Sequence, residues 1–414
     1  MKQILRFTTA GSVDDGKSTL IGRLLFDTHS VLDDQLSSLK ATSEQKGFDY
    51  VDFSLLTDGL RAERDQGITI DVAYRYFETE RRRFIIADTP GHIQYTRNMI
   101  TGASNADLAV ILVDARKGLV EQTLRHSFIS SLLGIRQVVL CVNKMDLVEY
   151  AESAFVEVRE AYQKFSASLN FKKVDFVPIA ALNGENIVQA SEQMRWYNGK
   201  TLLQLLEEAD LHREDVSPGF RFPVQYVIRP KNEEYPDYRG FAGRIASGKI
   251  KVGDDVVILP SGVRTQISRI ESGTNSLIEA EFPMSVSLLL ADDVDSGRGS
   301  LICSVVHQPV PYSQLEVMLC WLNGSTVHPG RKFLVRHHTA EYRGLLKSIG
   351  YRLDTTTFEH QHEVAALKMN DLAKVSLQTS TTVFADAYQS NRITGSIILI
   401  DEVTGETLAA GMIL

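Results

Sequence analysis

Four short polar stretches of the sequence each come directly after an apolar run. The first, at residues 11–18 (GSVDDGKS), fits the pattern G-x-x-x-x-G-K-S/T and lies between a predicted strand and a predicted helix. Glycines let the backbone curl so that its N–H groups surround a phosphate, and the start of the helix adds positive potential there. We expect Lys17 to reach the β- and γ-phosphates of a nucleotide and the Ser18 hydroxyl to bind Mg²⁺.

The second stretch, at residues 88–92 (DTPGH), follows the apolar run at 84–87. Asp88 can hold Mg²⁺ through a water molecule, and Gly91 leaves an unobstructed N–H for the γ-phosphate. His92 can orient a water molecule that attacks the γ-phosphate, a role that Gln fills in several GTPases. The alternative for His92 is a histidine that faces solvent at the start of a helix.

A hydroxyl ligand is also needed where a loop orders around the γ-phosphate and Mg²⁺. Residues 61–70 (RAERDQGITI) lie between the first two stretches, and Thr69 is the candidate ligand. The alternative is an exposed threonine that enters a strand at residues 70–77.

The third and fourth stretches favour recognition of guanine. In residues 143–146 (NKMD), the Asp146 carboxylate can accept from N1–H and the exocyclic N2–H₂ of guanine, whereas adenine has no matching pair of donors. Asn143 should brace the neighbouring loop, and the stem of Lys144 should cover one face of the base. In residues 178–184 (PIAALNG), the backbone N–H of Ala181 is the expected donor to guanine O6.

Each stretch alone is compatible with an ordinary turn or a solvated loop. The four occur in one order, each at the carboxyl end of a predicted strand, where ligands bind in an open α/β sheet. The combination predicts a site for GTP and GDP with Mg²⁺. The predicted catalytic residues are His92, Lys17 and Gly91, and the predicted metal ligands are Ser18, Thr69 and Asp88. The predicted nucleotide ligands are Gly11, Ser12, Val13, Asp14, Asp15, Gly16, Lys17, Ser18, Thr19, Asp88, Gly91, Asn143, Lys144, Asp146, Ala180, Ala181 and Leu182.

Alternating strands and helices must position these residues. Continuous apolar runs suit strands that are buried on both faces of a parallel sheet, and amphipathic stretches between them suit helices. The strands are expected at 5–10, 84–87, 108–113, 138–142 and 175–177, and the helices at 17–26, 122–133 and 154–169. This alternation predicts a mostly parallel sheet with helices on both faces.

The pattern changes near residues 215–219 (DVSPG), after which short β-type runs are separated by Gly, Pro, Asn and Asp. A second break falls near residues 308–311 (QPVP). The predicted fold class is an α/β P-loop GTPase domain followed by two all-β barrel domains, at 1–218, 219–307 and 308–414. The β-runs are expected at 222–228, 240–245, 255–259, 264–270, 315–321 and 397–400.

Composition limits the class of protein. The net charge of −8 and the pI of about 5.7 argue against a protein that coats nucleic acid. The N-terminus has no signal-peptide pattern, and no run of about 18 apolar residues predicts a membrane span. Cys141, Cys303 and Cys320 have no C-x-x-C spacing, so we expect buried, reduced thiols and a cytoplasmic location.

The motifs together resemble those of the translational GTPases around elongation factor Tu. The matching patterns are GxVDxGKST, RxxGIT, DTPGH and NKMD, and the resemblance covers the whole chain. It implies a G domain followed by two barrels. It also implies that Val13 and Ile68 are apolar gates beside the catalytic water.

One branch of that family is more similar: the large GTPase subunits of bacterial sulfate adenylyltransferases. In this branch Asp15 stands where elongation factor Tu carries His. The stretches that carry the resemblance are 11–18, 56–64, 92–99, 238–248, 391–395 and 409–412.

The sequence also departs from the family pattern. Ala180 stands where Ser is usual, so we expect slightly weaker bracing of that loop and intact guanine binding. The later G-x-x-x-x-G-K at residues 243–249 is followed by Ile250 within a β-rich stretch, which predicts a turn. Because the chain ends at Leu414, we expect no fused adenylylsulfate kinase.

The resemblance implies a partner, the small catalytic subunit that condenses ATP with sulfate to adenosine 5′-phosphosulfate, in a heterodimer or a larger assembly. Hydrolysis of GTP by this chain would drive that unfavourable step of sulfate assimilation and cysteine biosynthesis. No membrane association is expected. Two alternatives remain: a carrier of aminoacyl-tRNA similar to elongation factor Tu, and a signalling switch that hydrolyses GTP without coupled chemistry.

Overall fold

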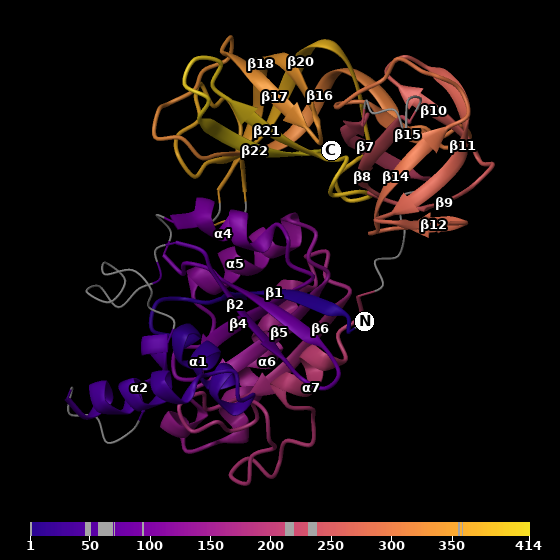
Figure 1. Cartoon of the computed structure of the whole chain (residues 1–414). Helices are drawn as coiled ribbons and strands as arrows, with labels where there is room; N and C mark the ends of the chain where they lie inside the picture. The colour runs from indigo at the N-terminus through magenta and orange to yellow at the C-terminus, as the bar shows by residue number, and fades with distance from the viewer. Residues whose placement is uncertain are drawn as a thin grey trace. The chain divides into compact units, whose positions relative to one another are not determined.

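The computed structural model describes residues 2–45, 51–56, 69, 71–92, 95–211, 219–230, 238–354, 357 and 359–414. The chain divides into two compact units, Met1–His212 and Arg213–Leu414, and each is described by itself (Figure 1). No helix among the described residues is long and apolar enough to cross a membrane.

The first unit is built on a six-stranded sheet of order β2-β3-β1-β4-β5-β6. All neighbouring strands pair in parallel except β2 and β3, which are antiparallel. The strands are β1 (Ile4–Ala10), β2 (Ala73–Glu78), β3 (Arg83–Asp88), β4 (Leu108–Asp114), β5 (Gln137–Asn143) and β6 (Lys173–Pro178). The helices are α1 (Lys17–Asp27), α2 (Asp33–Gln45), α4 (Thr96–Ala103), α5 (Glu121–Leu132), α6 (Glu152–Ser166) and α7 (Leu202–Glu207), with 3₁₀ turns η1 (Phe53–Leu56) and η3 (Met145–Val148).

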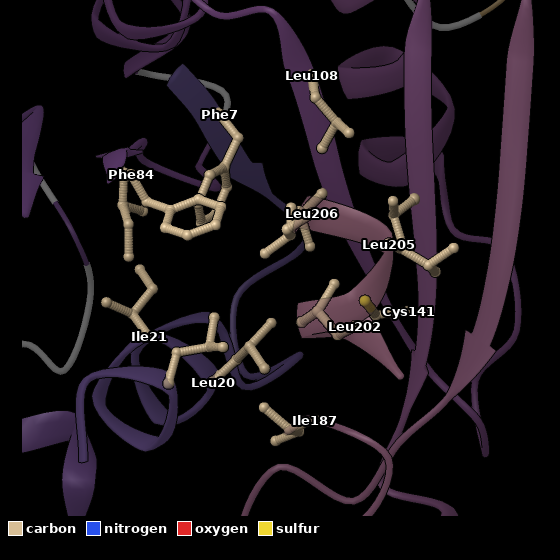
Figure 2. Close-up of a cluster of buried hydrophobic side chains, with 14 of the residues drawn as sticks. Phe7, Leu20, Ile21, Phe84, Leu108, Cys141, Ile187, Leu202, Leu205 and Leu206 are labelled. Atoms are coloured by element: carbon tan, nitrogen blue, oxygen red, sulfur yellow. The ribbon is translucent and has the colours of Figure 1, made fainter. Parts of the chain in front are cut away.

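Strand β4 is an example of a continuous apolar run at the centre of the sheet. All its residues are buried, because alternate side chains point to opposite faces and both faces are covered. Val110 and Leu112 belong to a cluster that includes Leu20 of α1 and Leu206 of α7. Figure 2 shows side chains of α1 and α7 converging with Phe7 of β1 on this face. The sheet thereby fixes the start of α1 next to the end of β1.

The predicted strands and helices of the first unit are confirmed, with ends that differ by a few residues. The strand expected at 70–77 begins later, at Ala73. Helices α2, α4 and α7 were not predicted from the sequence. Helix α7 has only six residues, and a capping box stabilises its start: Thr201 accepts from the Gln204 N–H, and the Gln204 side chain accepts from the Thr201 N–H.

The second unit contains two closed antiparallel barrels. In the first, the order β10-β15-β7-β8-β14-β11 is closed by pairing of β10 with β11, and in the second, β17-β21-β22-β16-β20-β18 is closed by pairing of β17 with β18. The first barrel and its short extra strands are β7 (Arg221–Ile228), β8 (Gly240–Arg244), β9 (Lys249–Lys251), β10 (Asp255–Leu259), β11 (Val263–Ser272), β12 (Asn275–Leu277), β13 (Glu279–Glu281), β14 (Ser285–Leu290) and β15 (Leu301–Ser304). The second comprises β16 (Val310–Trp321), β17 (Lys332–His337), β18 (Ala340–Leu353), β19 (His360–Gln361), β20 (Leu372–Ala385), β21 (Ser396–Ile400) and β22 (Thr407–Ile413).

A buried ion pair joins the two barrels. The Arg221 guanidinium is 1% exposed and donates to both oxygens of Asp386, at 3.0 and 2.9 Å. Asp386 also accepts from the Thr394 hydroxyl at 2.6 Å. Asn391 donates to the Ala246 carbonyl oxygen across the same boundary. The segment at 391–395, noted in the sequence for its resemblance, therefore holds one barrel against the other.

The predicted fold class is confirmed: an α/β domain followed by two all-β barrels. The domain limits at 218 and 307 stay a prediction, and residue 218 lies outside the described residues. Residues 243–249 end β8 and begin β9 through a turn, as predicted, with Gly248 at φ +70°. All three cysteines are free and buried.

Candidate nucleotide-binding site

The loop between β1 and α1 is shaped by close backbone approaches. Gly16 precedes α1 in the left-handed region, at φ +90°, and a Cβ atom on it would lie 2.5 Å from the Asn143 side-chain nitrogen. A Cβ atom on Gly91 would lie 2.7 Å from Lys17 Nζ and would collide with the Gly11 carbonyl oxygen. Larger residues do not fit at either position, so the end of β3 is packed directly against this loop.

Lys17 places a buried positive charge inside the loop. Its side chain is almost fully buried, and Nζ donates to the carbonyl oxygens of Gly11 and Ser12, both at 3.2 Å. Burial lowers the pKa of Lys17, while the charges of Asp88, Asp15 and Asp14 oppose that shift. An ammonium group among backbone carbonyls, at the start of a helix, suits the binding of a phosphate.

Asn143 ties two loops together through both ends of its side chain. Its nitrogen donates to the Asp15 carbonyl oxygen at 2.7 Å, and its oxygen accepts from the Ala181 N–H at 3.0 Å. The predicted bracing role of Asn143 therefore agrees with its contacts. The carboxylate of Asp15 also braces the loop, because it accepts from the Ser12 N–H at 2.6 Å.

The Ala181 N–H has a partner within the protein. It donates to Asn143 in this structure, and its expected role as the donor to guanine O6 stays a prediction. The next residue, Leu182, offers the neighbouring N–H, while its carbonyl oxygen accepts from Arg23. Ala180 is buried, and its N–H donates to the Glu185 carbonyl oxygen. The backbone of Ala180 therefore braces this loop without a serine hydroxyl.

Lys144 is positioned by both loop and strand contacts. Its backbone is left-handed, at φ +64°, and its Nζ donates to the Asp14 carbonyl oxygen and lies 3.1 Å from the Asp114 carboxylate. Asp146 follows two residues later in η3 and is half-buried. The lysine stem is thus held between the phosphate loop and the end of β4, beside the carboxylate expected to read the base.

Asp114 and Arg116 were not predicted as site residues. The Asp114 side chain is fully buried and accepts from the Arg116 backbone N–H at 2.9 Å and from its guanidinium at 3.0 and 2.7 Å. These donors, together with Lys144, hold the pKa of Asp114 far below its usual range even though burial acts in the opposite direction. The signal was present in the sequence, because residues 108–114 are an apolar run that ends in Asp, as residues 84–88 are.

Helix α5 supplies two further neighbours that the motifs did not reveal. The Gln122 side-chain oxygen accepts from the Ser12 hydroxyl. His126 lies one turn further along and is buried, which lowers its pKa to about 3, and the charges of Lys17 and Arg125 act in the same direction. His126 is therefore neutral at physiological pH and adds no positive charge beneath the loop.

The expected metal ligands carry the oxygen donors that Mg²⁺ prefers. Asp88 is buried at the end of β3 and accepts from the Thr9 hydroxyl at 3.2 Å, and Thr89 donates to the Thr9 carbonyl oxygen at 2.6 Å. Ser18 lies in the first turn of α1 and is half-buried, as is Thr69. The carboxylate of Asp88 acts on the charge of Lys17, and its chemistry and that of the Ser18 and Thr69 hydroxyls suit a magnesium ion.

The remaining expected residues lie beside this centre. His92 follows Gly91 directly, is half-buried, and its ring centroid lies 6.1 Å from that of Tyr95. Val13 is half-buried and Asp14 is exposed in the phosphate loop, where Asp14 has φ +68°. Thr19 is half-buried in α1. Ile68, the second expected gate, lies outside the described residues.

Comparisons with known proteins agree with this geometry. A family model of the elongation factor Tu GTP binding domain matches residues 2–213, and one described as GTP-eEF1A C-terminal domain-like matches residues 314–414. A solved structure of sup35 complexed with GMPPNP matches with 22% sequence identity and a TM-score of 0.46, covering 100% of this chain and 94% of that chain.

Curated relatives are similar along the whole chain. The bifunctional enzyme CysN/CysC of Mycobacterium tuberculosis is 50% identical over 415 residues, covering 100% of this chain and 68% of that protein. The sulfate adenylyltransferase subunit 1 of Cellvibrio japonicus is 48% identical over 415 residues, covering 100% of this chain and 87% of that protein. The subunit 1 of Bacteroides fragilis is 48% identical, with 86% of its length covered. The chain is therefore a GTPase of the translational GTPase family around elongation factor Tu and belongs, within it, to the family of sulfate adenylyltransferase subunit 1.

Proposed function

We propose that this chain binds GTP at the carboxyl ends of β1, β3, β4 and β5 and that its hydrolysis of GTP drives the synthesis of adenosine 5′-phosphosulfate by a partner subunit. The observation that carries the nucleotide site is the convergence of Lys17, Gly91 and Asn143 on one loop. These residues come from three separate motifs, so their meeting supports the assignment of all three.

Each part of the site takes one part of the nucleotide. Residues 11–18 surround the phosphates, with Lys17 neutralising the β- and γ-phosphates. Lys144 covers the base with its stem, and Asp146 reads N1–H and the N2 amino group of guanine. The Ala181 N–H is the proposed donor to guanine O6, and the neighbouring Leu182 N–H is a second proposed donor because the Ala181 N–H also contacts Asn143.

The hydrolytic step needs a positioned water and stabilised phosphate charge. We assign the positioning of water to His92, which stands next to Gly91, whose N–H serves the γ-phosphate. Ser18, Thr69 and Asp88 would hold Mg²⁺, which when bound neutralises phosphate charge. Lys17 stabilises the charge that develops on the transferred phosphoryl group.

The proposed partner follows from the names of the relatives. A protein called subunit 1 has at least one other subunit, and we propose that the partner here is the small catalytic subunit that uses ATP and sulfate. The two would form a heterodimer or a larger assembly in the cytoplasm and would serve sulfate assimilation and cysteine biosynthesis. Since adenosine 5′-phosphosulfate forms unfavourably, the partner must bind the GTP and GDP states of this chain with different affinities.

Delivery of aminoacyl-tRNA is the less favoured alternative. The relatives that match along the whole chain are named for sulfate adenylyltransferase, and the net charge is −8. A test of the proposal measures GTP turnover by the purified chain alone and then with the candidate small subunit, ATP and sulfate. We expect stimulation that requires all three additions. Turnover that is indifferent to them but changes with aminoacyl-tRNA would overturn the proposed coupling.

Asp146 offers a test of base reading. Asp146→Asn presents an amide donor that suits the C2 carbonyl of xanthine and no longer accepts from the guanine N2 amino group. We expect preference to move from GTP towards xanthosine triphosphate in a competition assay. Glu149→Gln, an exposed change three residues further on, should leave GTP preference unchanged. Unchanged GTP selectivity in Asp146→Asn would remove Asp146 from base recognition.

His92 offers a test of the hydrolytic step. His92→Ala should slow GTP hydrolysis by roughly 10²-fold while leaving GTP affinity near that of the unmodified chain, because the residue acts on the water and not on the ground-state nucleotide. Single-turnover hydrolysis and nucleotide binding are measured separately. His328→Ala, at an exposed position in the second unit, is the control. Normal turnover in His92→Ala would contradict the assignment.

Asp114 is proposed to position Lys144. Asp114→Asn keeps an oxygen acceptor but removes the charge that pairs with Lys144 Nζ. We expect KM for GTP to rise about tenfold, with kcat changed less than about twofold, because Lys144 faces the base. Asp175→Asn removes a carboxylate paired with Lys173 within β6 and should change neither constant. A fall in kcat at constant KM would contradict this role.

A further inference from the structure

The phosphate loop contains a buried carboxylate in addition to its lysine. Asp15 is only 2% exposed, and its Oδ2 accepts from the Ser12 N–H at 2.6 Å. The Asp15 carboxylate is therefore folded back onto its own loop. This contact places a negative charge in a loop whose other features suit the binding of an anion.

The negative charge of Asp15 is compensated only in part by the charged side chains around it. Burial raises the pKa of Asp15, and Asp114 acts in the same direction, whereas the hydrogen bond from Ser12 and the charges of Lys17 and Lys117 act against that shift. Lys17 is nearest in sequence, and its Nζ contacts the carbonyl oxygens of Gly11 and Ser12, the second of which belongs to the residue that donates to Asp15. The loop thus contains a cation and an anion that compensate each other.

Binding of phosphates changes this balance. A nucleotide brings several negative charges to Lys17, and the Lys17 charge is then shared between the phosphates and the Asp15 carboxylate. Because the site is buried, the repulsion between Asp15 and the phosphates is weakly screened by solvent and salt. The carboxylate therefore lowers the stability of the nucleotide-bound state relative to the nucleotide-free state.

We propose that Asp15 sets the lifetime of the bound nucleotide: its carboxylate braces the loop through Ser12 and repels the phosphates, so that GDP leaves quickly without help from an exchange protein. This inference rests on the proposed nucleotide site and extends it. Asp15 acts through the loop and its charge, so it is a positioning residue for binding and not a catalytic residue.

Asp15→Asn separates the two effects. The asparagine oxygen still accepts from the Ser12 N–H, but the negative charge is lost. In stopped-flow measurements with a fluorescent GDP, we expect dissociation to slow about tenfold. Asp15→Ala, which also loses the brace, should release GDP faster than Asp15→Asn.

A second variant reverses the charge effect. Lys117 is exposed and follows Asp114 in the loop after β4. Lys117→Met removes a cation that compensates Asp15, so GDP should dissociate about threefold faster. In the double variant Asp15→Asn/Lys117→Met, this acceleration should disappear, because the two side chains act on the same charge. Glu279→Gln, an exposed change in the second unit that alters net charge by one, should leave the rate unchanged.

These experiments distinguish a failure of the proposed role of Asp15 from a failure of the proposed nucleotide site. If the unmodified chain binds no guanine nucleotide, the nucleotide site and the role of Asp15 both fail. If it binds GDP but Asp15→Asn releases GDP at the same rate or faster, only the role of Asp15 is overturned. The same holds if Lys117→Met accelerates release equally whether or not Asp15→Asn is also present.

Discussion

The side chain of Asn143 is the contact on which the site depends. A carboxamide has a donor and an acceptor at fixed separation, and here each end meets backbone atoms of a different loop: the Asp15 carbonyl oxygen and the Ala181 N–H. The loop after β1 and the loop after β6 are far apart in sequence, yet one buried side chain sets their spacing. Gly16 must lack a Cβ atom because Asn143 occupies that space. The distance between the proposed phosphate and base subsites is therefore set by the residue at the end of β5.

Charged side chains surround the loops that Asn143 joins, and the members of each opposite pair differ in how deeply they are buried. Lys17 is buried among carbonyls, Asp88 and Asp15 lie near it, and Asp114 pairs with Lys144 and Arg116. A buried charge is stable only if its surroundings supply donors or opposite charge. The loops at the carboxyl ends of the parallel strands provide these groups, because a polar residue ends or follows each apolar run there. The apolar centre of the sheet makes the domain rigid, and the carboxyl ends of its strands carry the residues of the candidate site.

The strands of the first unit and the polar residues that follow them could be predicted from the sequence, because each is indicated by a local pattern of residues. The loop at 11–18 and the polar residues after β3 and β5 follow apolar runs whose pattern indicates a strand, and the structure confirms those strands. What could not be predicted depends on distant partners. The hydrogen bond from the Ala181 N–H to the side chain of Asn143 joins residues 38 positions apart, and no local pattern predicts it. Helices such as α7 were missed because six residues show no period, and their formation depends on tertiary packing.

Through the Arg221–Asp386 pair, each barrel supplies the counterion of a buried charge in the other. Arg221 comes from the first strand of one barrel and Asp386 follows a long strand of its neighbour, and the guanidinium is almost fully enclosed. A barrel separated from its neighbour would expose an ionic group without the counterion that the neighbour supplies. A genetic rearrangement that exchanges or deletes one barrel therefore leaves a charge without its counterion unless the remaining residue of the pair is replaced as well. The two barrels are expected to be inherited as one module for that reason.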